Sequence, residues 1–302
     1  MLTLAHLSDV HLAPLPRPQF HHLMNKRFLG YVNWQSRKGH YRRDVLDTII
    51  TDMLACNPGH IAVTGDLVNI ALPEEFVLAR LWLDRLGSPE DVTVVPGNHD
   101  AYSPFLRDPR LRHWRPFMMS NEAGAKRFGA HGLHFPFVRL IGRIALIGLS
   151  SARATLPGMA SGWLGARQMR EAANVLSMLG EDGYCRIVLI HHPPLPGMTS
   201  HIRGLHDARR FKAVLAEHGA ELVLHGHNHR TMQEWLPTSR KPIPIIGVSS
   251  ASLLHDKPEK CASYNLFTVE ETGDGWSISM LTRRLASNGQ FYETHQDLCA
   301  RT

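Results

Sequence analysis

Short apolar segments, each long enough for one buried strand, alternate along this sequence with segments whose apolar residues recur at helical spacing. The pattern predicts strands at Leu2–Ser8, His60–Thr64, Val92–Val95, Arg143–Leu149, Arg186–Ile190 and Glu221–Leu224. It predicts helices at Asp44–Cys56, Glu74–Leu86, Ala166–Leu179 and Ala208–His218. After about residue 242 it indicates strands alone, at Ile243–Val248, Tyr264–Val269 and Trp276–Leu281. Buried strands alternating with helices are typical of a layered α/β fold.

The chain has 302 residues, of which 43% are hydrophobic and 20% are charged. These fractions exclude a disordered or low-complexity chain, and no apolar run approaches the roughly 18 residues of a spanning helix. No internal repeat and no Pro/Gly/Ser-rich linker divides the sequence. We therefore expect one domain, 1–302, with basic aromatic insertions at about 14–43 and 101–143 and a strand-rich C-terminal part from about 242.

The N-terminal residues and the cysteines bear on location. The apolar N-terminus has no basic lead and runs directly into Asp9 and His11, which argues against a signal peptide. The cysteines lie far apart and form no CxxC pair, at Cys56, Cys185, Cys261 and Cys299. This spacing disfavours a disulfide framework and a Cys-type zinc site. We expect a cytoplasmic protein, with peripheral attachment to the inner face of the membrane as the alternative.

Polar clusters follow the predicted strands directly. They read Ser8-Asp9-Val10-His11, Gly65-Asp66, Gly97-Asn98-His99-Asp100, His191-His192 and His225-Gly226-His227-Asn228-His229. In open α/β sheets, ligands bind outside the carboxyl ends of the strands, so the five clusters should converge on one crevice. Each cluster alone is weak evidence, since a lone Asp-x-His is common. The five together, each after a buried strand, indicate a functional site.

Residue type points to the chemistry of that site. The chain holds 20 histidines, and histidine is the commonest metal ligand. Imidazole and carboxylate without thiolate suit borderline divalent ions such as Mn, Fe and Zn. The clusters offer enough donors for two ions, and a two-metal site is suited to an in-line displacement at phosphorus.

The five clusters, taken in order, resemble the signature of the calcineurin-like metallophosphoesterase superfamily: D-x-H, G-D, G-N-H-[DE], a histidine after a strand, and G-H-x-H. The resemblance implies a four-layer α/β/β/α sandwich of two mixed sheets flanked by helices. It also implies two metal ions. The first would be held by Asp9, His11, Asp66 and His229. The second would be held by Asp66, Asn98, His191 and His227, with Asp66 as the bridge.

The same resemblance implies a reaction: hydrolysis of a phosphate ester by a hydroxide that bridges the metals. In this reaction His99, which is not a ligand, stabilises the phosphoryl group or protonates the leaving oxygen. The stretch after Asp66 lacks the Asp-Arg pair of the protein Ser/Thr phosphatases. Asp100 and the run from His191 to Pro194 instead resemble bacterial class III cyclic-nucleotide and glycerophosphodiester phosphodiesterases. We therefore expect a phosphodiesterase, with a phosphomonoesterase as an alternative and a non-catalytic scaffold as the last choice.

Four further residues are candidates for a supporting or substrate-contacting role: Asp100, His192, His201 and His206. Only some seventy residues follow His229, which disfavours the repair nucleases with their added capping domains, and no nucleic-acid partner is expected. The sequence leaves the natural substrate, the native metals and the oligomeric state open.

The charge is concentrated in the two insertions. Residues 14–43 carry seven basic residues and no acidic one, and residues 101–143 carry eight basic residues against two acidic ones. Both segments are also aromatic. Three interpretations compete: steering of a phosphate substrate, contact with an anionic membrane surface, and insertions whose aromatics pack into the body. The membrane interpretation makes a phospholipid or a lipid-linked diphosphate the alternative substrate, with residues 25–34 as the contact.

Overall fold

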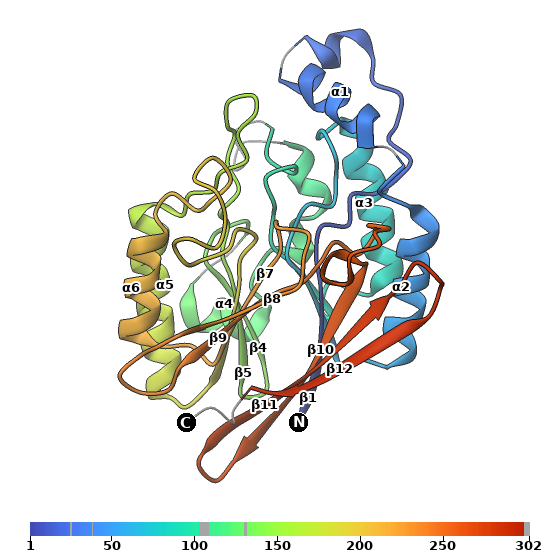
Figure 1. The fold of residues 1–302 in the computed structure, drawn as a ribbon. Coiled ribbons are helices and arrows are strands. Elements are labelled where there is room, and N and C mark those ends of the chain that lie inside the picture. The colour runs from blue at the N-terminus through green and yellow to red at the C-terminus, as the bar shows by residue number, and fades with distance from the viewer. Residues whose placement is uncertain (25, 38, 103–108, 130–131, 299–302) are drawn as a thin grey trace.

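Two six-stranded mixed sheets pack face to face in the computed structural model of the chain, and helices cover their outer faces (Figure 1). The structure describes residues 1–24, 26–37, 39–102, 109–129 and 132–298. This arrangement confirms the predicted α/β/β/α sandwich. Among the described residues, no helix is both long enough and apolar enough to span a bilayer.

The first sheet has the strand order β12-β11-β10-β1-β2-β3. Its strands, in that order, are Phe291–Asp297, Gly275–Leu285, Ser263–Thr272, Leu2–Leu7, His60–Val63 and Val92–Val94. β1, β2 and β3 run parallel, so their carboxyl ends lie side by side. β10 pairs antiparallel with β1, and β11 and β12 extend the sheet as antiparallel neighbours.

The second sheet has the order β4-β5-β6-β7-β9-β8. Its strands, in that order, are Phe137–Ile141, Ile144–Gly148, Cys185–Leu189, Leu222–His225, Ile243–Gly247 and Met232–Leu236. The four central strands are parallel, and the edge strands β4 and β8 are antiparallel to their neighbours. Parallel strands buried on both faces explain the near-continuous apolar runs in the sequence.

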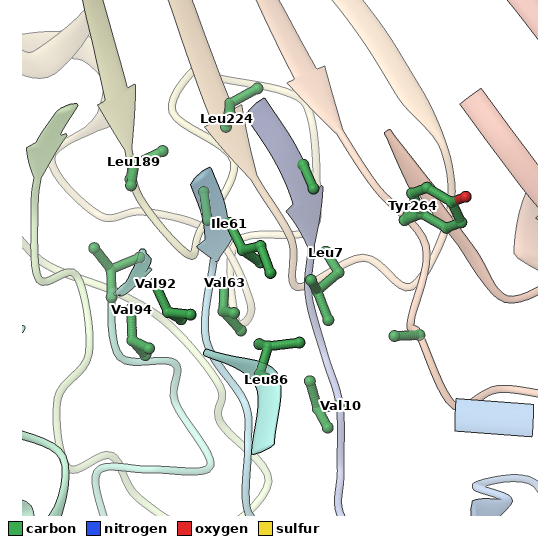
Figure 2. Close-up of a cluster of buried hydrophobic side chains, with 14 of the residues drawn as sticks. Leu7, Val10, Ile61, Val63, Leu86, Val92, Val94, Leu189, Leu224 and Tyr264 are labelled. Atoms are coloured by element: carbon green, nitrogen blue, oxygen red, sulfur yellow. The ribbon is translucent and has the colours of Figure 1, made fainter. Parts of the chain in front are cut away.

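The core fills the space between the sheets and continues beneath the helices. Figure 2 shows Leu7, Ile61 and Val63 of the first sheet with Leu189 and Leu224 of the second in one buried cluster. Alternate residues of the second sheet point away from that cluster and pack under α5 (Gly165–Glu181) and α6 (Ala208–His218). On the far side, α2 (Arg43–Ala55) and α3 (Pro73–Leu86) bury apolar stripes against the first sheet.

The predicted helices and strands are all present, with ends that differ by at most a few residues. The structure adds elements that the sequence analysis did not anticipate: α1 (Arg27–Arg37), α4 (Glu122–Phe128), β4, β8 and β12. β4 lies inside the segment 101–143 that we interpreted as an insertion, so the last part of that segment belongs to the second sheet. Short edge strands and an amphipathic helix of eleven residues give weak periodic signals, which explains why they were missed.

Candidate metal centre

The loops that follow the parallel strands meet at the carboxyl edge of both sheets. Asp9 and His11 follow β1, and their backbone N–H groups donate to the carbonyls of Gly65 (3.0 Å) and Asp66 (2.9 Å) after β2. From the second sheet, the His227 N–H after β7 donates to Asp9 Oδ2 (2.9 Å). These hydrogen bonds fasten the loops of the two sheets together, so the predicted convergence of the clusters is confirmed.

Five residues of these loops adopt left-handed backbone conformations that non-glycine residues seldom adopt. Their φ angles are 51° at Asp9, 42° at His11, 55° at Asp66, 71° at His227 and 49° at His229. Such strain persists only where surrounding structure fixes the backbone, and it gathers at functional sites. All five residues belong to the predicted ligand sets, so the strained backbone coincides with the candidate site.

Two glycines are required by close approach rather than by backbone angle. A Cβ at position 97 would lie 2.1 Å from Asp66 Oδ1, and one at position 226 would lie 1.9 Å from Ser8 Oγ. Any side chain at either place would push a strand-end loop out of the crevice. The glycines of the sequence motifs therefore set how tightly the two sheets close at this edge.

One group of donors surrounds a point next to β1. Asp9, His11, Asp66 and His229 each offer an atom, and these atoms all lie within 4.8 Å of one another. His229 Nε2 is 3.1 Å from Asp9 Oδ1 and 3.4 Å from His11 Nε2. Three of the four residues are buried, and His229 is partly exposed. Two carboxylates and two imidazoles in this space form a set that suits a divalent ion.

A second group of donors lies on the other side of Asp66. His191 Nε2 is 3.4 Å from Asp66 Oδ2, 3.2 Å from Asn98 Oδ1 and 3.3 Å from His227 Nδ1. All four residues are buried. Asp66 therefore belongs to both groups, and its carboxylate lies between them. The residues of the two predicted ligand sets are thus brought together, while their role as ligands stays a prediction.

Backbone carbonyls fix the orientation of the imidazoles. Nδ1 of His191 lies 2.7 Å from the Thr64 carbonyl, and Nδ1 of His11 lies 3.2 Å from the Val68 carbonyl. A Nδ1–H that donates to a carbonyl leaves Nε2 as the lone-pair nitrogen, and this nitrogen faces the donor group. Carbonyl acceptors of this kind are the usual outer support of metal-binding histidines.

The protonation states also suit a cation. Burial lowers the pKa of His11 to about 3, and it lowers the pKa of His227 well below its ordinary value, so both rings are neutral. Burial opposes ionisation of Asp9 and Asp66, but neighbouring histidines outweigh it and hold both carboxyl pKa values below the ordinary range. His191 is the exception: burial is outweighed by Asp66, Asp9 and the Thr64 carbonyl together, which raise the pKa of its imidazole to about 9, so a cation bound at Nε2 would replace a proton there.

Buried polar atoms without a hydrogen-bond partner indicate that the crevice is incomplete without a ligand. Asp9 Oδ1 and His227 Nε2 are such atoms, and both lie within the two donor groups. Buried polar groups are almost always satisfied, so an imidazole nitrogen without a partner in one donor group, and a carboxylate oxygen whose near neighbour is the His229 Nε2 at 3.1 Å in the other, fit a site for cations. The residues present therefore fit a pair of metal ions.

His99 is placed differently from the ligand candidates. Its backbone N–H donates to Asp66 Oδ1 (2.8 Å), and its Nδ1 is hydrogen-bonded to the Asn69 carbonyl. Glu75, buried at the start of α3, accepts from the Asn69 N–H (2.6 Å) and so fixes that carbonyl. His99 is only partly buried and lines the cavity above Asp66, with Nε2 free of the Asn69 contact. The sequence analysis missed this support, because Glu75 was recognised only as part of the first turn of a predicted helix.

Asp100 and His192 are buried supports and face no solvent. The Asp100 carboxylate accepts from the N–H groups of residues 66, 67, 68 and 97, so one side chain joins the loops after β2 and β3. His192 is hydrogen-bonded to Ser151 Oγ (2.7 Å) and to the Ala160 carbonyl (3.1 Å). Of the two roles left open for these residues, the supporting one agrees with their burial.

A cavity of about 480 Å³ opens above the two donor groups. Beyond the motif residues, its walls include Lys26, Tyr41, Tyr102, Ile202 and Arg203. The sequence offered little signal for these, because Lys26, Tyr41 and Arg203 lie in loops or on the unpredicted helix α1. Lys26 Nζ lies over the Tyr102 ring at 4.9 Å from its centroid.

The candidates His201 and His206 lie elsewhere. They line a neighbouring cavity of about 660 Å³ beside the start of α6. His206 Nε2 is 3.0 Å from Ser161 Oγ, and the two imidazoles contact each other edge to face. Arg203, which the sequence analysis did not single out, lies in the wall of the crevice cavity, where its Nη2 donates to the His227 carbonyl (3.1 Å).

Comparison with known proteins adds evidence from outside the chain. The family model described as calcineurin-like phosphoesterase matches residues 2–231. The chain is 27% identical over 286 residues to the glycerophosphodiester phosphodiesterase GpdQ of Enterobacter lignolyticus, covering 91% of this chain and 89% of that protein. It is 26% identical over 231 residues to a probable cyclic nucleotide phosphodiesterase of Synechococcus, covering 72% and 74%.

A solved structure shares the fold. The dimetal phosphatase of Danio rerio superposes with a TM-score of 0.61 at 13% identity, over 97% of this chain and 98% of that one. At this identity the likeness is one of architecture alone. It agrees with the two-sheet sandwich.

Proposed function

Because this chain belongs to the calcineurin-like phosphoesterase family, we propose that its crevice hydrolyses phosphodiesters with the help of two metal ions. At the family level the chain is a metal-dependent phosphoester hydrolase, and the preference for diesters is our inference. The observation that carries metal-dependent hydrolysis in this crevice is the pair of donor groups sharing Asp66 at the floor of an open cavity. Two of the relatives named above are phosphodiesterases, which supports the same preference.

The chain's residues divide the work. Asp9, His11 and His229 would hold one ion, Asn98, His191 and His227 the other, and Asp66 both. When bound, such a pair supplies Lewis-acid polarisation of the phosphoryl group and activation of water. Mn, Fe and Zn all match a set of imidazole, carboxylate and amide donors, so we propose an ion from this group.

His99 acts on the leaving group in this proposal. Its Nδ1–H donates to the Asn69 carbonyl, which fixes the ring and leaves Nε2 to hold a proton toward the cavity. A positioned histidine that protonates a leaving alkoxide contributes typically about 10²–10⁴-fold. The His99→Ala protein should therefore retain its metal content and lose about a hundredfold in turnover of an alkyl diester. With p-nitrophenyl leaving groups, which need no proton, the loss should be much smaller; an equal loss on both would contradict the role.

Cations in the cavity wall hold the substrate. Lys26 and Arg203 lie outside both donor groups and line the same cavity. They can contact a phosphoryl oxygen that the metal ions do not reach, and they add positive charge where the anionic substrate enters.

The test is a matched pair of chromogenic substrates. Protein reconstituted with Mn²⁺ is assayed on bis(p-nitrophenyl) phosphate and on p-nitrophenyl phosphate, beside Asp66→Ala and Asn98→Ala variants. We expect turnover of the diester by the wild type and its loss in both variants. The matched control is Asp274→Ala, which removes an exposed carboxylate from the turn between β10 and β11.

A phosphomonoesterase is the second candidate, because the donor groups serve either reaction. Turnover of the monoester alone would replace the proposed diesterase by that function. If the wild type were inactive on both esters with each of Mn²⁺, Fe²⁺ and Zn²⁺, a non-catalytic scaffold would be the remaining candidate function. We also propose a reducing compartment, and with it a cytoplasmic location, because Cys56 and Cys261 are free thiols and the sequence holds no CxxC pair.

A further inference from the structure

Exposed apolar side chains gather around the mouth of the crevice cavity. The segment that forms much of this rim, which we name the hood, comprises residues 17–24 and 26–36 and contains all of α1 except its last residue. Its exposed apolar side chains, with their exposed fractions, are Phe20 (83%), Met24 (73%), Phe28 (53%), Leu29 (53%) and Val32 (51%). Figure 1 shows α1 projecting from the body at the end where the strand-end loops lie. Soluble proteins rarely leave such a group of large apolar side chains in water without a purpose.

Two other loops complete the rim. Leu156 is 71% exposed, and it follows Thr155, whose Oγ1 accepts a hydrogen bond from Lys26 Nζ of the hood at 2.8 Å. Ile202 is 52% exposed and lines the crevice cavity, and its carbonyl accepts from the Ala160 N–H (3.0 Å). Three segments that are remote in sequence thus present apolar side chains around one opening.

The hood is tied to the catalytic crevice on its inner side. Leu29, Gly30 and Asn33 of α1 line the crevice cavity. Arg27 donates to the carbonyls of Ile70 (3.0 Å) and Ala71 (3.2 Å), in the loop that follows Asp66. The outer apolar residues are therefore held at a fixed place above the donor groups.

The charge of the rim is positive. The hood contains Arg17, Lys26 and Arg27 and no acidic residue. The basic residues that follow it are compensated, since Arg42 is ion-paired with Asp44 and Arg43 with Asp47 on α2. On the opposite side of the mouth, the exposed Arg203 stands next to Ile202. Apolar side chains flanked by cations match the headgroup level of an anionic bilayer.

The position of the rim favours a lipid surface over a protein partner. A protein that buried Phe28, Leu156 and Ile202 together would cover the opening and exclude substrate from the donor groups. A bilayer covers the same side chains and at the same time supplies phosphodiesters at the opening. The geometry is thus consistent with an occupant that is both partner and source of substrate.

We propose that the hood and the two rim loops dock on an anionic phospholipid bilayer, and that the crevice hydrolyses phosphodiesters anchored in it. This inference rests on the proposed function and deepens it by naming the substrate class. In the reaction, a P–O bond to the oxygen of water forms, the P–O bond to one ester oxygen breaks, and the released alkoxide takes a proton. The products are a phosphomonoester and an alcohol.

The test separates docking from chemistry. Wild type and a Phe20→Ser/Phe28→Ser variant are sedimented with vesicles of equal parts phosphatidylglycerol and phosphatidylcholine, and with vesicles of phosphatidylcholine alone. Neither phenylalanine lines the crevice cavity. The control is Leu81→Ser/Met178→Ser, which removes exposed apolar side chains from the outer faces of α3 and α5. Turnover is measured on p-nitrophenyl hexadecyl phosphate in the anionic vesicles and on soluble methyl p-nitrophenyl phosphate, which has the same leaving group.

We expect the wild type and the control to bind the anionic vesicles at least about fivefold better than the neutral ones. The hood variant should lose this binding, lose about tenfold in turnover of the hexadecyl diester, and keep its turnover of the methyl diester within about twofold. Three results would overturn the proposal. The first is no vesicle binding by the wild type, and the second is an equal loss of binding and of hexadecyl diester turnover in the control variant. The third is a molar mass that falls from dimer to monomer in the hood variant, which would make the rim a contact between copies of the chain.

Failure of the proposed function gives a different result. A wild type that binds anionic vesicles but hydrolyses neither diester would support the docking surface and contradict the phosphodiesterase activity. A wild type that hydrolyses the methyl diester but does not bind the vesicles would support the phosphodiesterase activity and contradict docking on a membrane.

Discussion

The two basic aromatic segments of this chain read alike in the sequence and differ completely in the structure. In the segment 101–143, Trp114 and Phe117 are fully buried. In the segment 14–43, Phe20 and Phe28 are exposed. The first kind of segment packs into its own protein, and the second presents its aromatics to a surface outside the chain.

The difference arises from the contacts that each segment makes with the rest of the protein. Trp114 stacks on Phe76 of α3 with ring centroids 4.7 Å apart, and its indole N–H donates to the Phe76 carbonyl (3.0 Å). Two basic residues of the same segment also have partners within the body: Arg127 is ion-paired with Asp182, and Arg139 is buried. In the hood, Trp34 stacks on Tyr31 of its own helix. The amino-acid composition of a segment cannot show whether its aromatic side chains are buried or exposed, because that depends on the other segments against which they pack.

The largest expected effect tests this contrast with one residue type. Trp114→Ala should lower the free energy of unfolding by about 4 kcal/mol, since it empties a filled site beneath α3 and removes a buried hydrogen bond. Trp34→Ala should lower it by about 1 kcal/mol or less, because the ring is half-buried. Urea unfolding monitored by circular dichroism measures both. Equal losses would show that the hood is packed as firmly as the segment 101–143.

The crevice could be predicted from the sequence much further than the rim. The motif residues stand directly after strands whose apolar runs are readable, and parallel strands bring their carboxyl ends to one edge. Even so, the left-handed backbone of Asp9 and His227 was not foreseen, nor was the carboxylate of Asp100 between two loops. Both depend on contacts between segments that no local pattern records.

The rim escaped prediction for a physical reason. Lys26 stands just before an amphipathic helix and Arg203 in a loop, and the positions of both are set by packing and by single hydrogen bonds. We expected His201 and His206 to be the better substrate candidates because they follow a ligand strand, yet they line a different cavity. In a loop, a shift of one residue decides which cavity a side chain faces, and chain order does not encode that shift.

The second prediction compares a buried with an exposed arginine of the two segments. Arg139 donates to the carbonyls of Met119 (2.9 Å), Val92 (3.3 Å) and Pro116 (2.7 Å), and also to that of Pro89. Arg139→Met leaves these carbonyls unpaired, so unfolding free energy should fall by about 3 kcal/mol. Arg17→Met in the exposed segment should change it by no more than about 0.5 kcal/mol. If both changes were small, the segment 101–143 would be held by its aromatics alone.

The third prediction concerns the one hood residue whose contacts bridge the cavity. Lys26 reaches across to Thr155 and lies over Tyr102, so Lys26→Met removes a cation from the cavity wall without emptying the hood. We expect KM for methyl p-nitrophenyl phosphate to rise about tenfold, with kcat within about twofold. Lys212→Met on the outer face of α6 is the control. Steady-state kinetics at low and high salt measure the effect, and a fall in kcat at constant KM would place Lys26 in the chemistry instead.

The smallest effect asks whether the segment 101–143 also tunes the body on which it packs. His60, at the start of β2, is buried with its Nε2 2.7 Å from Thr93 Oγ1. Burial, and after it the charge of Arg139, lower the pKa of His60 to about 3. The unfolded chain takes up a proton near the ordinary pKa of about 6.5, while the folded chain does not. The stability that neutral His60 contributes is therefore present above about pH 6.5 and declines as the pH falls toward 3.

Between pH 7.5 and 5.5, the wild type should accordingly lose about 1.3 kcal/mol more than His60→Gln, which keeps a donor for Thr93 and does not titrate. The other buried histidines titrate in both proteins, so they cancel in this difference. Urea unfolding of the metal-free chains at the two pH values measures it, with His295→Gln as the exposed control. In the Arg139→Met background the same difference, followed down to pH 3, should level off at a higher pH and at a smaller value, because without the guanidinium charge the pKa of folded His60 lies nearer its ordinary value. An unchanged difference would mean that burial alone sets this pKa and that the segment 101–143 contributes packing but no electrostatic effect at β2.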